Sequence, residues 1–110
     1  MKLVIAIIST ADLDELLRMM VSRGYRATVI DHRGGFLRQG NVTLLVGVQN
    51  AFVADVLRLI AEVCRLRSTL VNPAMPIAEP GDFFVSRPVE TIEGGAVSFV
   101  LNIERYERIA

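Results

Sequence analysis

The sequence has 110 residues, a length that fits one domain and leaves little room for a second. Its twelve basic and twelve acidic residues cancel, so no net field draws the chain to a nucleic acid polymer or to an anionic membrane surface. Hydrophobic residues make up 52% of the chain, yet no apolar run approaches the roughly 20 residues that a membrane span requires. We therefore expect a single domain over residues 1–110, without membrane insertion and without a nucleic acid partner.

The compartment is inferred from the cysteine count and from the first residues of the sequence. Cys64 is the single cysteine, so an intramolecular disulfide cannot form, and nothing indicates an oxidising compartment. The apolar run at the start of the sequence is too short for a signal peptide, and no small-residue cleavage site follows it. We expect a cytoplasmic protein.

The first half of the chain alternates strand and helix patterns. Residues 3–8 are apolar and rich in β-branched side chains, which predicts a strand that is buried on both faces. Apolar residues then recur at helical spacing up to Val21, and Gly24 is placed to end that helix. Residues 26–31 return to strand character. A second dense β run, residues 43–48, follows a glycine-rich hairpin loop at about residues 31–43.

The second half contains one more helix and one more strand. An apolar stripe from Phe52 to Cys64 predicts the helix, with Phe52 on the stripe. Residues 67–95 show neither a helical nor a strand period and contain all four prolines, so we expect a long loop there, with room for one short strand at residues 83–85. The final strand covers residues 97–103 and places Val97, Phe99 and Leu101 on one face.

This order of elements is β-α-β-β-α-β, the split arrangement of ferredoxin-like α+β folds. Right-handed crossovers then place both helices on one face of a four-stranded antiparallel sheet. The other face of such a sheet is normally polar, but residues 3–8 and 44–48 contain no polar side chain. Because a chain of this size cannot hide that surface alone, we expect an oligomer in which another copy covers it.

Catalytic and metal chemistry find little support in the sequence. The single histidine, His32, lies in a glycine-rich loop without the orienting carboxylate and nearby nucleophile that a general base needs. One His and one Cys do not supply the usual four ligands of structural zinc. Cys64 falls on the apolar stripe of the second predicted helix, where we expect a buried structural thiol. We therefore expect a protein that is not an enzyme and has no catalytic residues, no metal and no cofactor.

The best candidate for ligand binding is a segment whose residue types suit a nucleotide. It contains Arg26, Thr28, Arg33, Gly34, Gly35, Phe36, Arg38 and Asn41. The paired glycines free the backbone to present bare N–H groups, Phe36 offers a face on which a base can stack, and guanidinium groups match phosphate. From these residues alone, two interpretations carry even weight. One is a nucleotide site, and the other is a hairpin loop with Phe36 in the core and solvated arginines.

The same segment resembles the PII-like cyclic di-AMP receptor family. The resemblance rests on residues 1–6, Tyr25-Arg26-Ala27-Thr28, Gly34-Gly35-Phe36-Leu37-Arg38-Gln39-Gly40-Asn41, Gly47-Val48, residues 88–90 and residues 94–101. It implies a homotrimer of ferredoxin-like subunits that binds cyclic di-AMP in three clefts between neighbouring subunits. It also implies that the two predicted loops, at about residues 31–43 and 67–95, signal ligand occupancy to a downstream protein.

The resemblance also implies the ligand contacts. It assigns them to Arg26, Thr28, Gly35, Phe36, Leu37, Asn41, Gly47, Phe99 and the position of Arg108. Arg26 would contact phosphate, and Thr28, Asn41 and the Gly47 backbone would contact adenine. Arg108 stands where the family has a glutamine, and a guanidinium only donates hydrogen bonds whereas an amide also accepts them.

Two further departures leave the ligand open. His32 and Arg33 stand where the family has two threonines, which adds cationic donors to the loop. One alternative is therefore a PII-like sensor of a different nucleotide or small anion. The other is a trimeric protein-interaction module that binds no ligand.

Overall fold

The computed structural model describes residues 1–31, 40–71 and 89–109. Its elements are β1 (Lys2–Ser9), α1 (Leu13–Ser22), β2 (Ala27–Asp31), β3 (Asn41–Val48), α2 (Val53–Val63), β4 (Arg67–Val71), β5 (Val89–Glu93) and β6 (Ala96–Asn102). A short 3-10 turn precedes each α-helix, at Thr10–Asp12 before α1 and at Asn50–Phe52 before α2.

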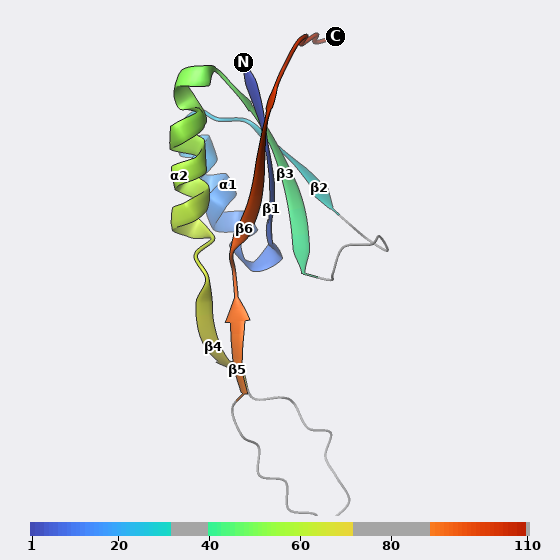
Figure 1. Cartoon of the computed structure of the whole chain (residues 1–110). Coiled ribbons are helices and arrows are strands. Elements are labelled where there is room, and N and C mark those ends of the chain that lie inside the picture. The colour runs from blue at the N-terminus through green and yellow to red at the C-terminus, as the bar shows by residue number, and fades with distance from the viewer. Residues whose placement is uncertain (32–39, 72–88, 110) are drawn as a thin grey trace, which may run out of the picture.

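The main sheet has four strands in the order β2-β3-β1-β6, and every neighbouring pair is antiparallel. Both α-helices lie on the same face of this sheet (Figure 1). The predicted α+β architecture, a four-stranded antiparallel sheet with two helices on one face, is therefore confirmed. The strands and helices form because residues 3–8 and 42–48 are dense in apolar and β-branched side chains, whereas residues 13–22 and 53–63 place apolar side chains at helical spacing.

The core lies between the sheet and the helices. Alternate side chains of β1 and β3 point into it, as the two-residue period of a strand requires. Its buried members are Val4, Ala6, Ile8, Leu16, Met20, Val42, Leu44, Val46, Val48, Val56, Leu59, Ile60, Val63 and Cys64. The prediction for Phe52 is wrong, since this side chain is 49% exposed. Phe52 belongs to the 3-10 turn ahead of α2, so the helical stripe does not extend to it.

The opposite face of the sheet has none of the described helices on it (Figure 1). The register aligns Leu3 with Leu101 and Ile5 with Phe99, so these side chains of β1 and β6 share this face. Val97, Phe99 and Leu101 are each about half exposed. The prediction that both faces of the sheet are apolar is therefore confirmed. We call this surface the open face.

The predicted loop at about residues 67–95 is wrong at both of its ends. Residues 67–71 form β4 and residues 89–93 form β5, and these strands pair with each other as a separate two-stranded sheet. Each strand has five residues, which is too short for its alternation to stand out beside the four prolines. The predicted short strand at residues 83–85 lies outside the described residues. The hairpin loop predicted at about residues 31–43 is also shortened, because β2 reaches Asp31 and β3 begins at Asn41.

The β4–β5 pair extends from the lower end of the main sheet in Figure 1, opposite the two chain termini. Two contacts fix its base, and Gly94 lies close to the backbone of the preceding segment. Arg67 forms an ion pair with Asp12 at 2.8 Å, and the amide of Gly95 donates to the carbonyl of Cys64 at 2.6 Å. Gly94 has φ +91°, and a Cβ there would lie 2.3 Å from the carbonyl oxygen of Arg65. The base of the pair therefore packs closely against the body of the fold.

Candidate functional site

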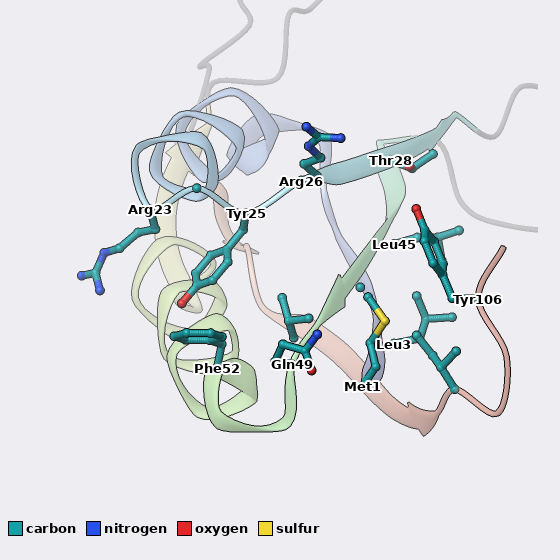
Figure 2. Close-up of a pocket in the computed structure, with 14 residues that line it drawn as sticks. Met1, Leu3, Arg23, Tyr25, Arg26, Thr28, Leu45, Gln49, Phe52 and Tyr106 are labelled. Atoms are coloured by element: carbon teal, nitrogen blue, oxygen red, sulfur yellow. The ribbon is translucent and has the colours of Figure 1, made fainter. Parts of the chain in front are cut away.

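A groove of about 710 Å³ opens at the end of the main sheet that carries both chain termini. It lies where the beginning of β1, the beginning of β2 and the end of β3 meet (Figure 2). Its lining residues are Met1, Leu3, Arg23, Gly24, Tyr25, Arg26, Thr28, Leu45, Gly47, Val48, Gln49, Phe52, Ile103 and Tyr106.

The turn between α1 and β2 positions the cationic side of the groove. Helix α1 ends at Ser22, and Gly24 adopts φ +79°, a left-handed conformation that glycine tolerates without strain. The amide of Tyr25 donates to the carbonyl of Met20 at 2.9 Å, which closes the helix end. Ala27 then begins β2 by pairing with Val46 of β3. Arg26 therefore lies between two fixed backbone positions, one on each side.

Asp55, in the first turn of α2, holds this α1–β2 turn from the helix side. The hydroxyl of Tyr25 donates to Oδ2 of Asp55 at 2.6 Å, and Nη1 of Arg23 lies 3.0 Å from Oδ1. Nη2 of Arg58 donates to the same Oδ1 at 2.6 Å. The hydrogen bond from Tyr25, followed by the bond from Arg58, lowers the pKa of Asp55 below its ordinary value. The same bond to Asp55 raises the pKa of Tyr25.

The two arginines of the groove differ in what they bind. Arg23 is engaged by Asp55 through both carboxylate oxygens, at 3.0 and 3.1 Å. Arg26 is exposed and has no ion-pair or hydrogen-bond partner within the described part of the chain. Its guanidinium therefore has its five N–H donors available to an anion that enters the groove.

Aromatic side chains border the groove on two sides. Figure 2 shows Tyr25 and Phe52 on one side of the groove and Tyr106 on the other. The rings of Tyr25 and Phe52 are 6.1 Å apart between centroids and inclined by 57°. Phe52 and Tyr106 are both well exposed. Exposed aromatic faces in the same groove as a cation that has no partner among the described residues suit a ligand that combines planar bases with negative charge.

The structure brings three of the predicted contact residues together in the groove, namely Arg26, Thr28 and Gly47. Arg26 precedes the first residue of β2 and Thr28 is its second, while Gly47 lies near the end of the neighbouring β3. The antiparallel pairing of β2 with β3 therefore places all three at one end of the sheet.

Other predicted contact residues lie elsewhere. Phe99 shares the open face with Thr28, in a row of paired residues that runs from Thr28 through Leu45 and Ile5 to Phe99. Three strand spacings separate the ends of that row, which places Thr28 and Phe99 about 14 Å apart. Arg108 is exposed in the C-terminal tail and does not line the groove.

Asn41 is at the far end of β3 from Gly47, six residues away, which corresponds to about 20 Å along the strand. It lines a separate depression near the base of the β4–β5 pair. Gly35, Phe36 and Leu37, with the neighbouring His32 and Arg33, lie outside the described residues. The predicted contacts of one chain are therefore distributed over both edges and both ends of its sheet.

Sequence reasoning missed the aromatic walls and Asp55. The sequence pattern predicts Phe52 in the core because its apolar side chain continues the stripe of the following helix. Tyr25 directly precedes Arg26, and that adjacency is the signal that could have identified it. Nothing in the sequence connects Tyr25 with Asp55, since 30 residues separate them and the contact arises only when α2 packs beside the α1–β2 turn.

The described residues show no metal centre and no membrane-spanning helix. They contain no group of three His, Cys, Asp or Glu side chains arranged to hold a metal ion. None of their helices is long and apolar enough to span a membrane. The expectation for Cys64 is confirmed, because this side chain is buried and desolvation raises the pKa of its thiol to about 11.

Two comparisons with known proteins cover nearly the whole chain. A sequence model of the family described as "Cyclic-di-AMP receptor" matches residues 1–109. Among solved structures, a functionally unknown protein from Pediococcus pentosaceus ATCC 25745 is similar, with a TM-score of 0.76 at 30% sequence identity. That alignment covers 98% of this chain and 96% of the Pediococcus chain. The match over residues 1–109 therefore includes every residue that lines the groove and the open face.

Proposed function

Because the chain belongs to the cyclic-di-AMP receptor family, we propose that it is a non-enzymatic signalling protein that binds cyclic di-AMP in the groove at Arg26. The observation that carries this proposal is that one groove contains both exposed aromatic faces and a guanidinium that has no partner among the described residues. Cyclic di-AMP offers the complementary groups, since it has two anionic phosphodiesters and two planar adenines. It acts here as a signal that is bound and released unchanged, in the cytoplasm.

The proposed contacts follow the chemistry of the lining residues. Arg26 donates to a phosphodiester, because a guanidinium matches the spacing of two phosphate oxygens. The hydroxyl of Thr28 and the backbone of Gly47 bind the edge of an adenine, for which the bare backbone of a glycine leaves room. Phe52 and Tyr106 provide apolar faces against which the adenine ring stacks.

The complete site is proposed to form between subunits of a homotrimer. In a cyclic trimer the contacts are heterologous, so one edge of each subunit meets a different edge of the next. The position of Thr28 near one edge of the open face and of Phe99 at the other supports this arrangement. Gly35, Phe36, Leu37, Asn41 and Arg108 complete the three clefts. The open face, which is apolar and uncovered in the single chain, is buried against the neighbouring copies.

Ligand occupancy is proposed to reach a downstream protein through the two segments that interrupt the sheet. Strand β2 carries Thr28 and leads directly into residues 32–39, so a contact at the groove acts on the strand that enters this segment. The second segment is the β4–β5 pair, which projects from the main sheet (Figure 1). Projecting elements of this kind are accessible to a partner, as signalling contacts require.

Isothermal titration calorimetry with cyclic di-AMP, cyclic di-GMP, ATP and AMP tests the proposal. We expect saturable heat with cyclic di-AMP and weaker or absent heat with the other three nucleotides. Heat only with ATP or AMP would instead favour the sensor of a different nucleotide. No heat with any of the four, in a sample that sediments as an oligomer, would favour the interaction module without ligand. Absence of cyclic di-AMP binding at tens of micromolar contradicts the proposal.

A further inference from the structure

Asp55 gathers three donors from two separate parts of the fold. Tyr25 and Arg23 come from the turn between α1 and β2, and Arg58 comes from α2, one turn after Asp55 itself. We infer that Asp55 and Tyr25 are positioning residues for Arg26, so that the affinity for an anionic nucleotide depends on them without their touching its phosphate. This inference rests on the proposed function, because it concerns how the same groove binds.

The backbone around Arg26 explains why a bond at Tyr25 affects it. On one side of Arg26, Ala27 is fixed by its pairing with Val46 in the sheet. On the other side, three contacts fix Tyr25. Its backbone N–H donates a hydrogen bond to Met20, its hydroxyl donates one to Asp55, and its ring contacts Phe52. Two of these three contacts are made to α2 or to the turn that leads into it. Arg26 therefore bridges the helix layer and the sheet, and Asp55 fixes the helix-layer end of that bridge.

The charges around Asp55 support the same role. Asp55 forms an ion pair with Arg23, which lines the groove. Arg58 pairs with both Asp55 and Glu62, and its Nη1 lies 2.9 Å from Oε1 of Glu62. Arg26 is left as the arginine of the groove whose guanidinium has no partner among the described residues. The arrangement thus separates two tasks between neighbouring arginines, because Arg23 anchors the turn and Arg26 remains available to the ligand.

A guanidinium carried on a fixed backbone meets the phosphate in more of the complexes than one on a loosened backbone, because less backbone entropy is lost when the ligand arrives. Fixing the backbone of one residue corresponds to roughly a fivefold change in the dissociation constant, which is about 1 kcal/mol. Loss of the Tyr25–Asp55 bond should therefore weaken binding by about that factor. This weakening should occur only in a protein that still has Arg26.

A double-mutant cycle measured by calorimetry with cyclic di-AMP tests this dependence. The variants are Tyr25→Phe, which removes only the hydroxyl, Arg26→Ala, and the two combined. We expect Tyr25→Phe to weaken binding roughly fivefold in the wild-type background, and to have no further effect on the Arg26→Ala protein. Equal weakening by Tyr25→Phe in both backgrounds overturns the inference.

A salt titration gives a second measure, which remains usable where Arg26→Ala binds too weakly for calorimetry. Binding through a guanidinium–phosphate contact weakens as salt rises. If Tyr25→Phe displaces Arg26, its affinity should depend less steeply on salt than that of the wild type. An unchanged salt dependence shows that the hydroxyl does not act through Arg26 and overturns the inference.

The matched control is Ser22→Ala. Ser22 also carries a hydroxyl at the end of α1, where it donates to the carbonyl of Met19 at 2.7 Å, and it has no contact with Asp55. Its removal should leave the dissociation constant unchanged. A conservative pair adds a further check, because Asp55→Asn keeps an acceptor for the Tyr25 hydroxyl and should retain more affinity than Asp55→Ala. Loss of affinity in Ser22→Ala equal to that in Tyr25→Phe contradicts a specific role for the pair.

The outcomes separate this inference from the proposed function. If the wild type itself gives no heat with cyclic di-AMP, the proposed function fails and the inference falls with it. If the wild type binds and folded Tyr25→Phe binds equally well, the proposed function stands and the inference alone is overturned. Thermal melting of each variant, with titrations run well below the melting temperature, establishes that the compared proteins are folded.

Discussion

The guanidinium of Arg67 donates a hydrogen bond of 2.8 Å to Oδ1 of Asp12, a residue 55 positions earlier in the chain. The side chain of Asp12 is only 6% exposed, and its second oxygen is buried without a hydrogen-bond partner among the described residues. The contact joins the first residue of β4 to the turn that leads into α1. A buried carboxylate is costly without such a partner, so this pair has a measurable role in stability.

Replacing Arg67 with Ala should destabilise the protein by about 1–3 kcal/mol, because Asp12 then stays buried without its charged partner. Urea denaturation measures the loss. The matched control is Arg65→Ala, since Arg65 is an exposed arginine two residues earlier and its side chain does not contact Asp12. Similar stability of the two variants would show that the ion pair contributes nothing.

Replacing Arg26 with Ala should weaken cyclic di-AMP binding about 10- to 100-fold, the usual effect of losing a hydrogen bond to a charged group. Calorimetry gives the dissociation constants. Arg18→Ala is the control, because Arg18 is an exposed arginine of α1 that does not line the groove. Unchanged affinity in Arg26→Ala would place the phosphate contact elsewhere.

A charge on the open face should dissociate the assembly. Leu101 is 49% exposed on this face, and Leu101→Asp would bury a carboxylate against the neighbouring copy. Analytical ultracentrifugation should give three times 12.1 kDa for the wild type and a smaller species for the variant. Val21→Asp is the control, since Val21 is 71% exposed on α1, away from the open face. A monomeric wild type would refute the proposed trimer.

Asp55 should contribute stability that is lost in acid. Its pKa lies below the ordinary value of 3.8, first because of the Tyr25 hydroxyl and then because of Arg58. The folded protein therefore binds this proton less tightly than the unfolded chain does. The contribution is present above pH 3.8 and disappears as the pH falls through the lower folded pKa. The melting temperature of Asp55→Asn should accordingly lie below that of the wild type at pH 7 and approach it in acid. A difference that is constant with pH would contradict this assignment.

Cys64 should be nearly inert in the folded protein. Its side chain is 3% exposed, and burial, with a smaller effect from Asp12, raises its pKa to about 11. At pH 8 roughly one thiol in a thousand is then ionised, and the thiolate is the reactive form. An aromatic disulfide reagent should react slowly with the native protein and quickly in concentrated urea. Equal rates in the two conditions would show that the thiol is accessible.

The sheet and the helices could be predicted because their signal is dense and local. The apolar strand of residues 3–8 needs no long-range information, and Gly24 ends α1 as its position suggests. The open face also followed from sequence, because an apolar residue at every position of a strand makes both faces apolar. Tertiary contacts were not needed for any of these conclusions.

The β4–β5 pair could not be predicted in this way. Its two strands are separated by 17 residues that contain all four prolines of the chain. Neither five-residue segment shows enough alternation of apolar and polar residues to be recognised as a strand from the sequence. Each is stabilised as a strand by pairing with the other. The close packing of Gly94 under Arg65 and Arg67 is likewise a property of the assembled fold.

The candidate site was predictable only in part, for the same reason. Arg26 and Thr28 are two residues apart, and a segment rich in nucleotide-compatible residues identified them. Asp55 has no such residues near it in the sequence. It lies on the polar face of α2 and resembles an ordinary solvated carboxylate. Its role depends on the packing of α2 beside the turn that carries Tyr25.

The groove also contains the chain's own optical reporters. The sequence has no tryptophan and two tyrosines, and both of these, Tyr25 and Tyr106, line the groove. The intrinsic ultraviolet emission of this protein therefore originates almost entirely from the walls of one depression. An unlabelled wild-type sample should report a ligand entering there, and Tyr25→Phe and Tyr106→Phe would assign the signal to one wall or the other.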